Sequence, residues 1–208
     1  MRGDIDWSAR PFPCTNVEKK LMPLHGTAPI FFKNGFYCVD CDGTLGALHL
    51  KKDGSWSVLA KPKKIFNNDM HPKLLVVCGG DLLLIKLGHL GTAVRIYRLD
   101  SSEMEWVKVE SLGKHMLFIS ETSCMSAVAP NTQMENIIYF PRTYLNGGGI
   151  LSYSLATGSY HSSFTENCQD SLKNSFHETK GWLSNCTWIQ PNWCKSTEQE
   201  LDWLNPLR

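Results

Sequence analysis

The feature that most limits the possible folds of this chain is a hairpin pattern that recurs about every fifty residues. In the clearest copy, apolar and polar side chains alternate from Val94 with the period of a strand, turn at Asp100-Ser101-Ser102, and return through Trp106. The aromatic residue of the returning strand recurs as Trp56, Trp106 and Tyr160, in steps of 50 and 54 residues. A repeat of this length, built from short strands with glycine at the turns, is typical of a kelch-like β-propeller blade.

A second apolar strand, which begins at a turn, precedes each copy of the hairpin. These strands start at Phe36, Leu82 and Ile137, which lie 20, 24 and 23 residues before the aromatic residue. The pattern predicts an all-β, propeller-like fold of repeated four-stranded antiparallel blades, about three of which are recognisable. The alternative is an ordinary β-sandwich in which the hairpins are unrelated.

The repeat divides the chain into three predicted parts. Residues 1–28 form an irregular N-terminal segment, residues 29–195 form the propeller domain, and residues 196–208 form a short C-terminal helix or tail. The blades lie at about 29–60, 73–110 and 116–164, and the strands of the third are expected near 124–129, 136–142, 150–155 and 160–163. A propeller usually has about four to eight blades, so three predict a partial or truncated ring.

Composition narrows the range of partners. The chain has 208 residues and a formal net charge of +1, which provides no extended positive field for nucleic acid. The first residues lack the apolar core of a secretory signal, and apolar runs such as 82–85 are too short to span a bilayer. We therefore expect a protein of the cytoplasm, the nucleus or both, with no membrane partner, whose eight cysteines are reduced.

No set of residues has the spacing of a catalytic or metal site. Cys38 and Cys41 form a CxxC pair, but a zinc site needs four ligands, and no second pair follows. The seven histidines are scattered, and no serine lies in a G-x-S-x-G turn. We predict no catalytic, cofactor-binding or metal-binding residue, no cofactor, and no enzymatic activity. Binding is expected instead at the connections 61–72, 88–92 and 143–149, because loops on a rigid scaffold commonly select partners.

Several segments occur in the order of a known plant domain. The most specific is Leu99-Asp100 followed by Trp106-Val107-Lys108-Val109-Glu110-Ser111-Leu112-Gly113, and Trp188-Ile189-Gln190-Pro191 is similar to the end of that domain. Over residues 29–164 and this last segment, the chain resembles the propeller domain of plant F-box-associated, KIB-type proteins. The resemblance implies a protein-interaction module that selects proteins for ubiquitination by a Skp–Cullin–F-box ligase.

The chain departs from that family in two places, and only the first affects the expected partners, while the second weakens the match locally. Residues 1–28 are too short and too rich in proline for the helical F-box, so the Skp adaptor is expected to bind only if an F-box is present elsewhere. The segment before Asn136 lacks the glycine and cysteine usual in the family. Two other functional classes remain open: a degenerate or truncated paralogue without activity, and a propeller enzyme with a site in the central channel.

Overall fold

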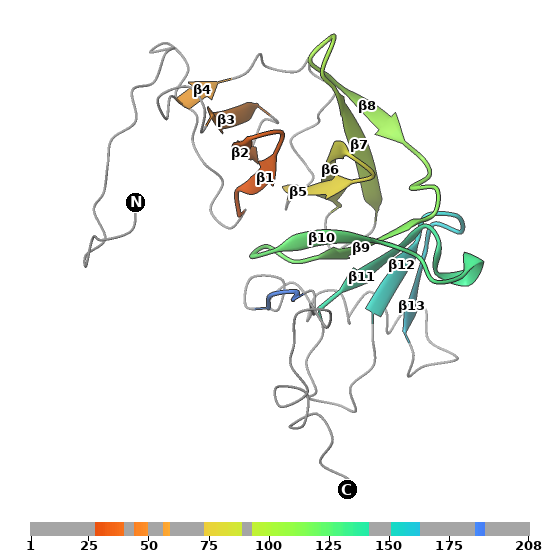
Figure 1. The fold of residues 1–208 in the computed structure, drawn as a ribbon. Helices are drawn as coiled ribbons and strands as arrows, with labels where there is room; N and C mark the ends of the chain where they lie inside the picture. Colours follow the sequence, from red (N-terminus) through yellow and green to blue (C-terminus); the bar gives the residue numbers. More distant parts are fainter. Residues whose placement is uncertain are drawn as a thin grey trace, which may run out of the picture.

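The computed structural model describes residues 28–39, 44–49, 56–58, 73–88, 93–141, 151–162 and 186–189. Most of these residues lie in strands, which form three sheets (Figure 1). Apart from Ala28, the predicted N-terminal segment lies outside the described residues, as does the predicted C-terminal helix. Within the described residues, no helix is long and apolar enough to cross a membrane.

The first two sheets confirm the predicted antiparallel blades. Each has four strands in sequence order, joined to their neighbours by antiparallel pairing. The first contains β1 (Ile30–Phe32), β2 (Gly35–Val39), β3 (Leu45–His49) and β4 (Trp56–Val58). The second, or middle, sheet contains β5 (Lys73–Cys78), β6 (Asp81–Leu87), β7 (Val94–Asp100) and β8 (Glu105–Val109).

The third sheet differs from the expected four-stranded blade. It has five strands in the order β10-β9-β11-β12-β13. The strand expected beside β11 was the one near 124–129, but β9 takes that place and pairs with β11 in parallel. These strands are β9 (His115–Ile119), β10 (Cys124–Val128), β11 (Ile137–Phe140), β12 (Leu151–Ser154) and β13 (Ser159–Ser162).

Burial explains why β9 occupies the interior of the third sheet. Leu117 and Ile119 of β9 are fully buried, whereas every residue of β10 is only partly buried or exposed. The more apolar strand therefore lies inside the sheet, and β10 lies at its edge, where partial exposure costs less. A short 3-10 turn at Thr132–Met134 connects β10 to β11.

The middle sheet is buried on both faces because alternate residues of a strand point to opposite sides. Leu82 and Leu84 of β6 belong to a cluster shared with the first sheet. Leu83, Ile85 and Leu87 belong to a second cluster, shared with the third sheet. Face-to-face stacking of this kind is the arrangement of consecutive propeller blades. Figure 1 shows the three sheets in an arc, with β1, β5 and β10 toward its middle and β4, β8 and β13 toward its outside.

The turn between β7 and β8 forms as the sequence predicts. The Asp100 carboxylate accepts hydrogen bonds from the Ser102 backbone N–H at 2.9 Å and from the Ser102 hydroxyl at 2.6 Å. These bonds hold the pKa of Asp100 below its usual range. Met104 completes the turn with a positive φ of 53°, and the strand then returns through Trp106.

Candidate functional site

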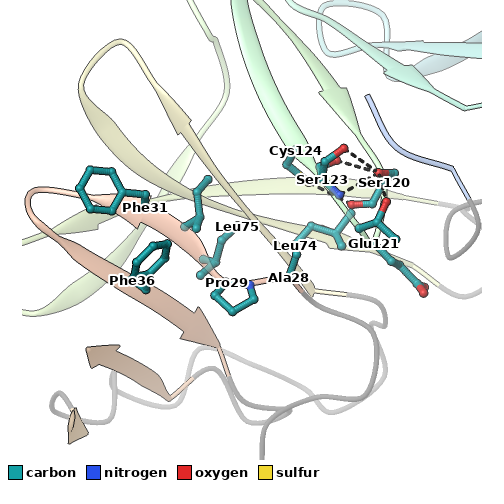
Figure 2. Close-up of a pocket in the computed structure, with 12 residues that line it drawn as sticks. Ala28, Pro29, Phe31, Phe36, Leu74, Leu75, Ser120, Glu121, Ser123 and Cys124 are labelled. Atoms are coloured by element: carbon teal, nitrogen blue, oxygen red, sulfur yellow. Dashed lines mark hydrogen bonds between the residues drawn. The ribbon is translucent and has the colours of Figure 1, made fainter. Parts of the chain in front are cut away.

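A pocket of about 290 Å³ lies where the three sheets approach one another at the middle of the arc (Figure 2). We term it the inner pocket. One wall comes from the chain entering β1 and from Phe36 of β2, and another from Leu74 and Leu75 at the start of β5. The third wall is the turn between β9 and β10, residues 120–124. All three sheets therefore contribute to one site.

The turn between β9 and β10 is held by the side chain of Ser120, which is fully buried. Its hydroxyl donates to the Ser123 carbonyl at 2.7 Å and accepts from the Ser123 N–H at 3.0 Å. A buried hydroxyl satisfied in this way fixes the shape of the turn. The same turn also holds the chain that leads into β1, because the Glu121 carbonyl accepts a hydrogen bond from the Ala28 N–H at 3.1 Å.

The described C-terminal segment, residues 186–189, also packs on this turn. The Trp188 N–H donates to the Ser123 hydroxyl at 2.7 Å, and the Thr122 hydroxyl donates to the Cys186 carbonyl. The Trp188 ring lies against Phe118 of β9, with ring centroids 5.0 Å apart. Segments more than 150 residues apart in the sequence, at Ala28 and Trp188, thus meet at one turn.

The lining of the inner pocket is suited to binding rather than to reaction. Phe31 and Phe36 pack edge to face, with ring centroids 5.3 Å apart, and Leu74 and Leu75 add buried aliphatic surface. Among the described residues of the lining, Glu121 and Cys124 are ionisable, and the rest are apolar or carry a hydroxyl group. A largely apolar cavity with a few polar groups at its edge matches an apolar side chain of a ligand.

The Cys124 thiol lines the pocket but is not activated for nucleophilic chemistry. Burial of the sulfur raises the pKa of Cys124 to about 12, and the thiol donates a hydrogen bond to the Ser120 carbonyl at 3.2 Å. With this pKa the thiol stays protonated near neutral pH. It is therefore a poor nucleophile, because the thiolate is the reactive form of cysteine.

We expect alkylation of Cys124 by iodoacetamide at pH 8 to be far slower in the folded protein than in urea, as measured by mass spectrometry of its peptide. The raised pKa also predicts that folding stability falls as pH rises from about 9 to about 12, because only the unfolded chain then releases this proton. Equal alkylation rates in the two states would show that the thiol is accessible and contradict its burial.

A second pocket, of about 430 Å³, lies beside the middle sheet and the chain that leads from β8 to β9. The charged side chains at its edge are paired, with Arg98 3.7 Å from Asp81 and Lys108 2.8 Å from Glu110. These side chains are more than half exposed, so the pairs contribute little to stability. The pairing leaves these four side chains with balanced charge at the edge of the pocket.

The sequence-based expectations about cysteine and the loops are tested only in part. Cys38 is half-buried in β2, while Cys41 lies outside the described residues, so the CxxC pair is not placed. Cys38, Cys78, Cys124 and Cys186 form no disulfide. In the part of the chain that the structure describes, no three potential metal ligands cluster. Of the loops expected to bind a partner, 61–72 and 143–149 lie outside the description, and only Gly88 of 88–92 is described.

The inner pocket was not predicted from the sequence. Its lining comes from three segments that are separated by more than thirty residues each, so no local motif marks it. The one sequence signal near it is the Ser120-Glu121-Thr122-Ser123 run, in which short hydroxyl side chains favour a turn between two strands.

Comparison with known proteins decides the family. The family model of the KIB1-4 beta-propeller matches residues 3–161, which is most of the chain. The chain belongs to the KIB1-4 beta-propeller family. This confirms the resemblance inferred from the sequence and, with the open arc of stacked sheets, the expected partial propeller.

The chain is also similar to the F-box/kelch-repeat protein At1g57790 of Arabidopsis thaliana, with 26% identity over 149 residues. The matched region covers 70% of this chain and 42% of that protein, so the chain spans less than half the length of this relative. The family and this distant relative together support a protein-interaction propeller.

Proposed function

We propose that this chain is a protein-recognition module that binds a segment of another protein at the inner pocket, as the substrate-selecting part of a Skp–Cullin–F-box ubiquitin ligase. The observation that carries the proposal is the pocket itself, which all three stacked sheets build and which has an apolar lining with hydroxyl groups at its edge. The printed name of the relative, an F-box/kelch-repeat protein, supports the ligase context.

The chemistry of the pocket indicates the type of ligand. Its volume of about 290 Å³ is near the lower end of ligand-binding cavities, which is enough for one or two large side chains. Phe31 and Phe36 offer aromatic edges, whereas the hydroxyl groups of Ser123 and Thr122 are already bonded to residues 186–188. An apolar or aromatic side chain in an otherwise extended segment fits this combination best.

The proposal includes binding without catalysis. Cys124 is the thiol among the described residues of the lining, and its pKa is raised to about 12. General acid–base catalysis needs a group that titrates near the operating pH beside a reacting atom, and the described residues of the lining include no histidine. We place this recognition in the cytoplasm or nucleus, and we propose that the Skp adaptor is recruited only where an F-box is joined to the propeller.

The test is a pull-down from plant extract with the 208-residue chain and two arginine variants. Ala28 is exposed at the mouth of the inner pocket, so Ala28→Arg places a long charged side chain there while keeping the backbone N–H that Glu121 accepts. Ser101→Arg adds the same side chain at the exposed turn between β7 and β8, far along the chain from the pocket.

The original chain and Ser101→Arg are expected to enrich the same protein, and Ala28→Arg is expected to lose at least about nine-tenths of it, because a charge in an apolar pocket is costly. Equal enrichment by all three proteins would place the binding surface elsewhere. Failure of the original chain to enrich any protein would favour a degenerate paralogue.

A further inference from the structure

Each sheet carries a row of side chains at matching positions, which the strand register defines. In the middle sheet, Val77 pairs with Leu82, and Leu99 pairs with Trp106. Leu82 lies level with Leu99, because the adjacent residues Leu83 and Arg98 are partners. The middle-sheet row is therefore Val77, Leu82, Leu99 and Trp106.

The other two sheets contain the equivalent row, which ends at the same aromatic position of the sequence repeat. In the third sheet, the register joins Leu117, Ile138, Tyr153 and Tyr160. In the first sheet, it joins Phe31, Phe36, Leu48 and Trp56, which we term the first-sheet row.

Two of the three rows are buried against the preceding sheet. Leu82 and Trp106 of the middle-sheet row are each 1% exposed and pack in the cluster shared with the first sheet. Leu117 and Ile138 of the third-sheet row are fully buried in the cluster shared with the middle sheet. In the middle and third sheets, the row is thus the surface that contacts the sheet before it.

The first-sheet row differs because no sheet precedes it among the described residues. Phe31 is 54% exposed and Phe36 is 39% exposed, although both occupy positions that are covered in the middle sheet. Two adjacent phenylalanines in contact, exposed to this degree on one sheet face, are typical of an interaction surface. The repeat also indicates what this surface fits. Its equivalents in the other two sheets pack against the face that the preceding sheet turns toward the next sheet, so the first-sheet row fits a face of that kind on another blade.

The third sheet has such a face, opposite its buried row. The register places Met125, Phe118, Tyr139, Ser152 and His161 across it. Phe118 and Tyr139 stack with centroids 5.1 Å apart, and Trp188 extends this aromatic surface. Its apolar residues lie on β10, β9 and β11, and its polar residues on β12 and β13. The two phenylalanines of the first-sheet row lie on β1 and β2, also toward the middle of the arc (Figure 1).

We propose that a second copy of this chain covers the first-sheet row with the Phe118–Tyr139 face of its third sheet. The same contact occurs twice, because each copy has both surfaces, and a two-fold axis then closes the assembly. Two copies of the three sheets that the structure describes make six, within the range of about four to eight blades found in propellers. This inference goes beyond the proposed function, because it needs no partner protein. Phe31 and Phe36 also line the inner pocket, so a second copy on this row would compete with a segment bound there.

The first experiment measures the mass of the 208-residue chain by sedimentation velocity at concentrations from about 1 to 100 µM, a range in which specific protein contacts are commonly populated. The expected result is a discrete species of twice the 23.5 kDa monomer. Phe31→Ser and Tyr139→Ser are each expected to raise the dissociation constant about a hundredfold, tenfold for each of the two equal contacts. Val107→Ser is the matched control, because Val107 is 43% exposed on β8, away from both surfaces.

The second experiment mixes the two variants. A mixed dimer of Phe31→Ser and Tyr139→Ser chains keeps one unaltered contact and lacks both side chains in the other. Because Phe31 and Tyr139 belong to the same contact, loss of the second side chain adds little to the loss of the first. The dissociation constant of the mixed dimer is therefore expected to be about tenfold above that of the original chain, against about a hundredfold for either variant alone. Restoration also shows that both variants are folded. A chain that stays monomeric at every concentration would overturn the proposal. The first-sheet row would then be covered by another part of the same chain or by another protein. Open chains of increasing length, an equal effect of Val107→Ser, or no restoration on mixing would overturn it as well.

Discussion

Replacing Trp106 with alanine is expected to lower the free energy of unfolding by about 3–5 kcal/mol, the usual cost of removing a large aromatic side chain from a core. The indole is 1% exposed and packs in the cluster between the first and middle sheets. Its loss leaves a cavity at a contact between two sheets, so the change weakens the stacking of the sheets as well as the β7–β8 hairpin. Urea unfolding followed by circular dichroism measures the difference.

Val107→Ala provides the control for this prediction at the next residue of the same strand. Val107 is 43% exposed, and its substitution is expected to change stability by less than about 0.5–1 kcal/mol. Because the two residues share a strand, strand propensity affects both variants, and the difference between them reports burial. Similar losses for both variants would mean that Trp106 does not lie between packed sheets.

Asn136→Ala is expected to cost about 2–4 kcal/mol, because Asn136 combines a hydrogen-bonding role with an unusual backbone conformation. Its side-chain oxygen accepts from the Leu112 N–H at 2.6 Å and from the Ser111 hydroxyl at 3.0 Å. Its φ is 61°, in the left-handed region that asparagine tolerates better than alanine. Its N–H donates to the His115 carbonyl at 2.9 Å, beside the parallel pairing of β9 and β11.

Two further variants at this position separate the two causes. Asn136→Gly removes the acceptor but relieves the backbone strain, so it is expected to lose about 1 kcal/mol less than alanine. Asn136→Asp keeps an acceptor for Leu112 and is expected to remain within about 1 kcal/mol of the original chain, measured in the same urea titration. A loss for aspartate as large as that for alanine would show that the acceptor is unimportant.

The parts of the fold that the sequence predicts are those governed by local pattern. The alternation from Val94 to Leu99 and the short polar residues at Asp100-Ser101-Ser102 specify a hairpin without reference to distant residues. The aromatic position of the repeat is Trp106 in the middle sheet and Tyr160 in the third. Trp106 packs in the cluster between the first and middle sheets, and the Tyr160 ring packs beside Phe140 and Tyr153.

The parts that the sequence does not predict depend on contacts between distant segments. The run His115–Ile119 is compatible with an edge strand or an interior strand, and its parallel pairing with β11 follows from the competition with β10 for burial. The inner pocket has the same origin. Nothing in the local sequence of Ala28, Leu74 or Ser120 indicates that these residues line one cavity.

The alternation along β6 has a consequence for how such a chain changes over generations. Leu83 belongs to the cluster shared with the third sheet, and Leu84 to the cluster shared with the first. Adjacent codons therefore specify contacts with different neighbours, and a substitution at one leaves the other contact in place. A repeat built in this way can gain or lose a blade at one end while the remaining stack keeps its inherited fit.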